Sequence, residues 1–115
     1  MTRREPLIRI HHMLDHAKEA VALLGDRSRS ELACDRTLNL ALVRLMEIVG
    51  EAAARIPEDF RSLHSQVRWQ DVADLRNRLI HGYDAVDLDI LWTIITDDLG
   101  PLIEQLDDMI DHSDP

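Results

Sequence analysis

One short string brings together side chains that can perform acid–base and phosphate chemistry. It runs from Leu75 to Tyr83 with the sequence LRNRLIHGY, and it holds two guanidiniums, an amide, an imidazole and a phenol. Phosphodiester cleavage needs a group that transfers a proton near neutral pH and a cation that stabilises charge on the non-bridging oxygens. Histidine and arginine supply these functions, and arginine can bind phosphate with two parallel hydrogen bonds. The string therefore indicates a candidate phosphate site.

The spacing inside this string places its polar side chains together if the string is helical. Asn77 and His81 are four residues apart, so they would share a helix face, and the long Arg76 side chain can swing toward the same place. The partial negative charge at a helix C-terminus favours the protonated form of His81, which can act as a general acid. Arginine and histidine near a helix end also commonly cap carbonyls or pair with acids, so spacing alone leaves both interpretations open.

The elements that must position the string are predicted to be helices. In the segment between Glu5-Pro6 and Gly25, apolar residues recur at alternating steps of three and four, which is typical of one helix stripe. Proline at the start and glycine at the end favour these boundaries. The predicted stripe consists of Leu7, Ile10, Leu14, Ala17, Val21 and Leu24.

Three further helical segments follow. A helix that is apolar on more than one side is predicted from Leu38 to Ile56, capped by Asp35 or Thr37, with a short helical turn from Pro57 to Leu63. Another is predicted from Trp69 to His81, with Gly82 as its stop.

The last helix is predicted to start near Asp87 and to reach Met109 or Ile110, and the Gly100-Pro101 pair predicts a kink within it. We therefore expect an all-α fold, a small antiparallel bundle of four main helices plus a short helical turn, forming a single domain over residues 1–115.

The composition agrees with such a domain. The chain has 115 residues, of which 45% are hydrophobic and 30% charged, a balance that is too apolar for a disordered protein. Aromatic residues make up 3%, and there are 4 Gly and 4 Pro, which disfavours a β-sandwich or barrel. Cys34 is the single cysteine, so no internal disulfide or cysteine-cluster zinc site is possible. We expect a cytoplasmic protein without a membrane-spanning segment.

The net charge of −9 is unevenly distributed. Residues 1–83 hold 13 basic and 12 acidic side chains, whereas residues 84–115 hold ten acidic side chains and no Lys or Arg. A polyanion responds to the local charge within about 10 Å at ordinary salt, so the acidic total does not exclude nucleic-acid binding at the Arg-bearing string.

The histidines near the N-terminus and the two tryptophans are expected to have structural or solvent-exposed positions and not functional ones. His12 and His16 have the spacing of metal ligands, with His11 beside them, but nothing completes a site and we expect no metal. Trp69 and Trp92 lie on apolar stripes, which favours core packing over base stacking.

The string resembles the Arg-x4-His-x-Tyr motif of HEPN-domain proteins, and specifically that of the HepT-like toxins. Arg76, His81 and Tyr83 occupy the motif positions, and Asn77 is the usual polar residue after the arginine. The segment EIVGEAA from Glu47 to Ala53 is similar to the family's Ile-Gly-Glu-Ala segment, with Val49 where isoleucine is commoner. Two other features also fit: Trp69 before the motif, and DLDILW at residues 87–92 after it.

This resemblance implies an all-α homodimer in which two copies of the motif face one cleft. It implies a metal-independent endoribonuclease without a cofactor, acting as the toxin of a two-gene toxin–antitoxin system. The implied roles are His81 as general acid or base, Arg76 as stabiliser of the phosphorane charge and Asn77 as a positioning group. The implied partner is a small nucleotidyltransferase antitoxin that in some members adds AMP to the motif tyrosine, here Tyr83.

Several alternatives remain open. Glu51 is expected either to pair with an arginine near the cleft or to face water, and Arg78 either to touch the RNA backbone or to be a solvated cation. The acidic residues Asp84, Asp87 and Asp89 are expected either to attract a basic face of the antitoxin or to be solvated acids at a helix start. The chain could also be a non-catalytic module that binds nucleotide or RNA, or a structural dimer whose C-terminal acids recruit a basic partner.

Overall fold

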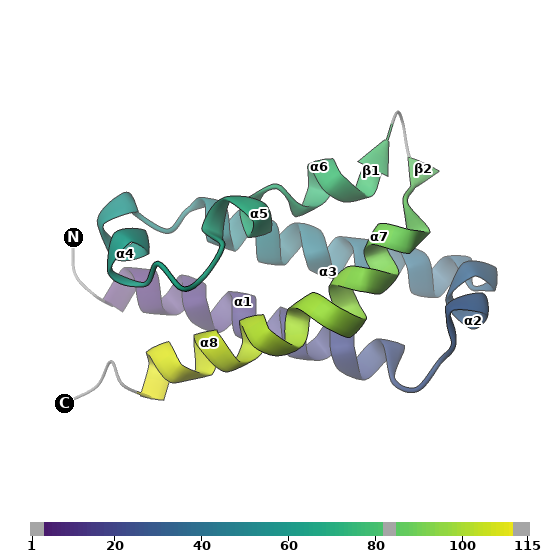
Figure 1. The fold of residues 1–115 in the computed structure, drawn as a ribbon, viewed down its shortest axis with the longest axis horizontal. Coiled ribbons are helices and arrows are strands. Elements are labelled where there is room, and N and C mark those ends of the chain that lie inside the picture. Colours follow the sequence, from purple (N-terminus) through teal and green to yellow (C-terminus); the bar gives the residue numbers. More distant parts are fainter. Residues whose placement is uncertain (1–3, 82–84, 112–115) are drawn as a thin grey trace.

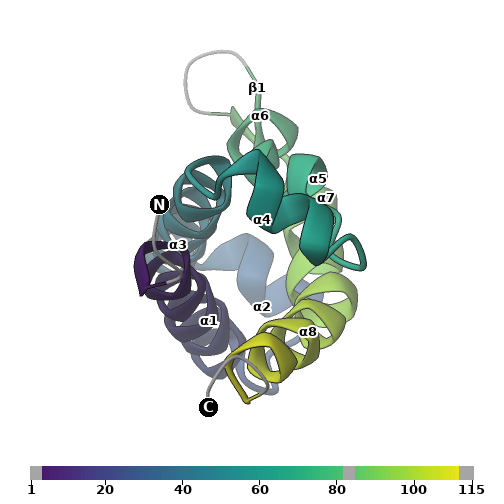
Figure 2. The ribbon, with the colours of Figure 1, turned by 90° about the vertical axis from the view of Figure 1, so that its left-hand side faces the viewer.

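The computed structural model describes residues 4–81 and 85–111, which form a small bundle of helices (Figure 1). Two long helices, α1 (Arg4–Leu24) and α3 (Arg36–Ala54), lie side by side and antiparallel. The end view in Figure 2 shows them on one side of the bundle, with α5 (Trp69–Ala73), α7 (Leu88–Thr93) and α8 (Leu99–Asp111) on the other. The remaining elements are α2 (Arg29–Cys34), α4 (Glu58–Leu63), α6 (Leu75–Leu79), β1 (Ile80–His81), β2 (Ala85–Val86) and the π-helix η1 (Ile94–Asp98). The prediction of an all-α bundle is confirmed.

Helix α1 ends as predicted, but one residue of its predicted stripe is wrong. Gly25 has a φ of 60°, and its N–H donates to Val21 O at 3.0 Å, which closes the helix. The Val21 side chain is 39% exposed, whereas Met13 and Ala20 are fully buried. Successive residues of a helix are about 100° apart around its axis. With Ala20 facing the core, the next residue, Val21, therefore faces solvent.

Helix α2 was not predicted from the apolar pattern, because among its residues only Leu32 is buried. A capping box holds its start: Ser28 Oγ accepts from the Glu31 N–H at 3.1 Å, and Glu31 Oε1 accepts from the Ser28 N–H at 3.1 Å. The Ser-x-x-Glu pattern that produces this box is visible in the sequence.

Helix α3 begins where the sequence predicts. Asp35 is its N-cap, and Asp35 Oδ1 accepts from the Leu38 N–H at 3.0 Å. Further along the helix, a side chain at Gly50 would place its Cβ 3.1 Å from Val72 O and 3.4 Å from Ala73 O. Glycine at this position therefore allows the backbone of α5 to lie directly against α3.

The segment from Trp69 to His81 is not one helix, contrary to the prediction. It is divided at Asp74 into α5 and α6, and α6 ends at Leu79. The next residues form an antiparallel hairpin in which Ile80 pairs with Val86 and His81 with Ala85. Ile and His have weak helix propensity, so pairing with a strand from later in the chain outweighs continuation of the helix. The predicted stop, Gly82, lies outside the described residues.

The last helical segment starts after Asp87, as predicted, but its irregularity lies elsewhere. Gly100 and Pro101 are inside the regular helix α8, and the five residues before it, Ile94–Asp98, form the π-helix η1. The Leu99 N–H donates to Ile94 O, one residue further back than in an α-helix. The backbone hydrogen-bond pattern is thus shifted just before Pro101. The proline itself lacks an N–H, so it needs no hydrogen-bond acceptor within the helix.

The core is apolar, so the polar side chains that could take part in catalysis lie at or near the surface. Among the described residues, no polar or charged residue is buried. Trp69 is buried, as predicted, and its Nε1–H donates to His64 O at 3.0 Å, while Trp92 packs half-buried against the core. No described helix combines the length and the apolar character that a membrane crossing requires. The large side chains with no exposed surface or almost none are Ile10, Met13, Leu32, Leu42, Met46, Val49, Leu79, Leu91, Ile94, Leu99 and Leu106.

Candidate functional site

Arg76 projects from the first turn of α6 and meets a carboxylate from α3. Its Nε–H donates to Glu47 Oε2 at 3.0 Å, and its side chain is otherwise exposed. The two residues meet because the backbone of α5, just before α6, lies against Gly50 of α3. This contact uses the Nε–H donor, and the guanidinium has four further N–H donors on its terminal NH2 groups.

His81 lies in β1, two residues beyond the end of α6, and it also faces a carboxylate. Its Nε2 is 3.6 Å from Asp87 Oδ2, and its side chain is exposed. The hairpin creates this proximity, because the Asp87 N–H donates to Leu79 O at 2.8 Å. Asp87 is at the same time the N-cap of α7, since its Oδ1 accepts from the Ile90 N–H at 3.1 Å.

The structure changes the predicted geometry of the string. Asn77 is exposed on α6, but it does not share a helix face with His81, because the helix ends at Leu79 before it reaches the histidine. For the same reason, the predicted location of His81 at a helix C-terminus is wrong. Tyr83 lies outside the described residues.

The carboxylates that pair with the motif are not the one the sequence singled out. Glu51 is exposed, and the partner of Arg76 is Glu47, one helical turn earlier on α3. The sequence pattern does not distinguish between two glutamates four residues apart on the same helix face. Asp87 was recognised as a helix start, but its contact with His81 depends on the unpredicted hairpin.

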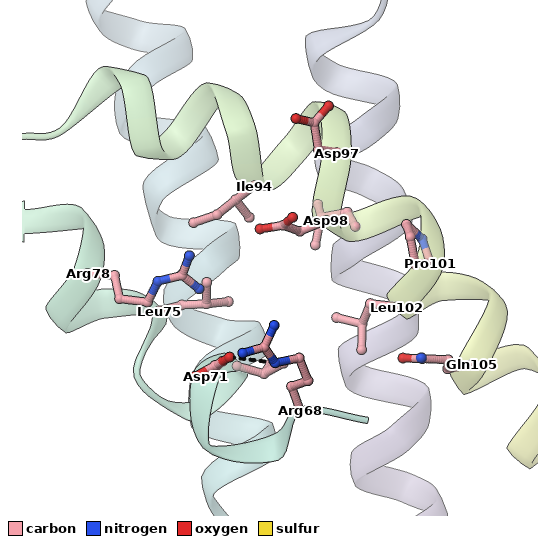
Figure 3. A pocket seen from close by; sticks show the side chains of 12 residues that line it. Arg68, Asp71, Leu75, Arg78, Ile94, Asp97, Asp98, Pro101, Leu102 and Gln105 are labelled. Carbon is pink, nitrogen blue, oxygen red and sulfur yellow. Dashed lines mark ion pairs between the residues drawn. The ribbon is translucent and has the colours of Figure 1, made fainter. Parts of the chain in front are cut away.

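Arg78 points in a different direction from Arg76. It is half-buried in the wall of an open pocket of about 250 Å³ between the α5–α6 segment and η1–α8. Figure 3 shows Arg78 and Arg68 on one side of this pocket and Asp98 on the other, with Arg68 paired to Asp71 at 2.9 Å. The floor of the pocket is apolar and includes Leu75, Ile94 and Leu102.

Two of the three acids after the motif are engaged within the chain. Asp87 caps α7, and Asp89 Oδ1 accepts from Arg29 Nε–H of α2 at 2.8 Å. Asp84 lies outside the described residues. These contacts connect α7 to the hairpin and to α2.

The histidines of α1 do not form a metal-binding cluster. His11 and His12 are exposed, and His16 Nδ1 lies 2.6 Å from His12 O. In the part of the chain that the structure describes, no three His, Cys, Asp or Glu side chains are grouped to hold a metal ion.

Arg76 and His81 lie close together along the chain. From Arg76 to His81 the chain spans three helical steps and two extended ones, so their Cα atoms lie at most about 12 Å apart. Both side chains are exposed at the surface, and neither lines the pocket. An exposed imidazole and an exposed guanidinium within this span can act on one phosphodiester of a polymer.

Comparison with known proteins agrees with this chemistry. The family model described as ribonuclease HepT-like matches residues 13–109. A protein of Thermococcus cleftensis named "Probable ribonuclease HepT" is 36% identical over 93 residues, which are 77% of this chain and 84% of that protein. A protein of Caldanaerobacter subterraneus named "Putative RNase" is 32% identical over 101 residues, which are 88% of this chain and 90% of that protein.

A further protein named "Putative RNase", from Methanocaldococcus jannaschii, is 28% identical over 110 residues, which are 96% of this chain and 91% of that protein. No solved structure matches the chain at a significant level. The family match spans both Arg76 and His81, together with Glu47 and Asp87, which face them. The chain therefore belongs to the ribonuclease HepT-like family of HEPN ribonucleases.

Proposed function

We propose that this chain is a metal-independent endoribonuclease that acts as the toxin of a two-gene toxin–antitoxin system. One observation carries the proposal: in a chain of this family, the motif side chains Arg76 and His81 are both exposed, at 62% and 61%. A substrate as large as RNA requires its cleaving groups at the surface. Exposed ion pairs contribute little to stability, so a purely structural role would give these two side chains little to do.

The proposed roles follow from the chemistry of each side chain. His81 transfers the proton at the 2′-hydroxyl or at the leaving 5′-oxygen, and Arg76 stabilises charge on the non-bridging oxygens of the phosphorane. Asn77, exposed one residue after Arg76, positions the RNA by hydrogen bonds from its amide.

The proposed assembly is a homodimer with two copies of the motif in one cleft. Most apolar side chains of α3 are buried within this chain, but Leu40 is 51% exposed. Leu40, Arg44, Glu47 and Glu51 follow one another at helical spacing, so Leu40 lies on the stripe that leads to the partner of Arg76. A second copy packed on this stripe would form a wall beside the motif.

The proposed regulator is a nucleotidyltransferase antitoxin that adds AMP to Tyr83. Tyr83 is two residues from His81 in the sequence, so an AMP group on it would carry a phosphate anion close to the side chains that are proposed to act on RNA. That phosphate would compete with the RNA backbone for the same groups.

Cleavage of an RNA by the purified protein tests the activity. We expect cleavage in the presence of EDTA, and a loss of about 10²-fold or more for either Arg76→Ala or His81→Ala with an unchanged helical spectrum. A wild-type protein that binds RNA without cutting it would instead identify a non-catalytic binding module. Activity that requires a divalent metal would refute the metal-free mechanism.

A further inference from the structure

The carboxylate of Asp87 makes two different contacts with its two oxygens. Oδ1 accepts from the Ile90 N–H at 3.1 Å and so caps α7, while Oδ2 lies 3.6 Å from His81 Nε2. The Asp87 backbone is fixed as well, since its N–H donates to Leu79 O at 2.8 Å and its carbonyl accepts from the Leu91 N–H at 2.9 Å. Asp87 is therefore held to the hairpin on one side and to α7 on the other.

A cap alone does not require this arrangement. Asp35 caps α3 in the same way, with Oδ1 accepting from the Leu38 N–H at 3.0 Å, and it has no histidine partner. The second oxygen of Asp87 is therefore available for a purpose other than capping. Its carboxylate is half-buried, whereas His81 is exposed, so the acid is the fixed member of the pair and the imidazole is the member that it orients.

The direction of the contact distinguishes the two ring nitrogens of His81. A carboxylate facing Nε2 favours a proton on that nitrogen, and it leaves Nδ1 as the nitrogen that faces away from Asp87. In catalytic triads an aspartate acts in this way, by holding the imidazole in one tautomer and one orientation. A distance longer than a hydrogen bond in the free protein is compatible with such a role, because these contacts often tighten when the substrate is bound.

We propose that Asp87 is a positioning residue for His81, which holds the imidazole in the Nε2–H tautomer so that Nδ1 exchanges the proton with RNA. The proposal rests on the function proposed above for His81. It assigns to Asp87 a role that neither the motif nor the capping of α7 requires.

Asp87→Asn is the decisive variant. Asparagine caps a helix about as well as aspartate, so its amide oxygen retains the bond to the Ile90 N–H. The amide NH2 then faces Nε2 in place of an acceptor, which favours the opposite tautomer. Asp35→Asn is the matched control, because it changes an N-cap of the same chemistry that does not contact the motif.

Two measurements are made on the wild type and on both variants. The first is the kcat and KM of RNA cleavage, and the second is the tautomer of His81 from the ¹⁵N shifts of its ring, assigned by comparison with His81→Ala. For Asp87→Asn we expect kcat to fall by about 10-fold or more, the lower end of the losses seen when a carboxylate that orients a metal-bound histidine is removed, with KM little changed. We expect the His81 tautomer to shift toward Nδ1–H, and Asp35→Asn to leave both readouts unchanged.

The outcomes separate this proposal from the one on which it rests. An Asp87→Asn protein with wild-type kcat, or with an unchanged His81 tautomer, overturns the positioning role. A tautomer shift in a protein whose wild type does not cleave RNA supports the orientation of His81 by Asp87, and it refutes the ribonuclease function together with the proton exchange at Nδ1. If Asp87→Asn fails to fold, Asp87→Ser keeps one capping oxygen and removes the second, and a wild-type kcat in that variant would equally overturn the proposal.

Discussion

Arg76 and Glu47 are 29 positions apart in the sequence, yet Arg76 Nε–H donates to Glu47 Oε2 at 3.0 Å. The glutamate side chain is 22% exposed and the arginine side chain 62%, so the carboxylate is the better-fixed partner. Because a guanidinium is planar and rigid, the bond at Nε restricts the directions in which both terminal NH2 groups can point. The pair thus aims the part of Arg76 that would bind a phosphate.

Removal of the Glu47 carboxylate is expected to lower kcat/KM for RNA cleavage while it changes the free energy of unfolding only slightly. Exposed ion pairs contribute at most about 1 kcal/mol, so Glu47→Ala should change the free energy of unfolding by no more than that. The loss of a fixed Arg76 direction should lower kcat/KM by about 10-fold, and Glu47→Gln should recover part of it because the amide oxygen still accepts from Nε. Denaturation and cleavage assays check this, with Glu104→Ala on α8 as the control. A Glu47→Ala protein more active than the wild type would show that the pair restrains Arg76 instead.

Alanine substitutions at Gly50 and Gly100 are expected to change the stability of the protein in opposite directions. A Cβ at Gly50 would lie 3.1 Å from Val72 O, so Gly50→Ala must push α5 away from α3 and should cost about 1–3 kcal/mol. A Cβ at Gly100 would meet nothing within 4 Å, so Gly100→Ala should stabilise α8 by up to about 1 kcal/mol. Thermal unfolding of the two variants measures the difference. Equal stability would contradict the close approach of α5 to α3.

The capping box of α2 makes a pH-dependent contribution to the stability of the fold. Hydrogen bonds from the Ser28 backbone and side chain lower the pKa of Glu31 below its usual value of 4.5. Because the folded-state pKa is the lower one, the stabilisation is complete above the unfolded pKa and is lost as the pH falls through the folded value. We expect Ser28→Ala to raise the pKa of Glu31 toward its usual value, as followed by NMR titration of the carboxyl group. A pKa that does not move in this variant would exclude the Ser28 side chain as a cause and leave the backbone N–H of residue 28.

Modification of Tyr83 is testable by mass. Co-expression with an adjacent nucleotidyltransferase gene should add one AMP mass, or a few, to the protein. Tyr83→Phe removes the acceptor hydroxyl while it keeps the ring, so this variant should stay toxic and escape neutralisation by modification. Intact-mass measurement and a growth assay check both claims. A Tyr83→Phe toxin that is still neutralised, with no adduct on the wild type, would show that the antitoxin acts by occlusion.

The sequence by itself determined the long helices and several of their ends. The alternating apolar steps before Gly25 predict α1, and Asp35 was one of two candidate caps for α3. These features are local, because helix periodicity and capping involve residues within about one turn of each other. The motif residues Arg76 and His81 were recognisable for the same reason: their types and spacing are contained in a single short string.

The tertiary structure alone decided how these motif residues are held. The break at Asp74, the end of α6 at Leu79 and the hairpin all depend on contacts between segments distant in sequence, which outweigh the weak helix propensity of residues such as Ile80. Glu47 meets Arg76 because α5 packs against Gly50 of α3, and Asp87 meets His81 because the hairpin folds the chain back. No local pattern encodes either contact, since each results from the packing of elements whose side-chain spacing is set only after the bundle has formed.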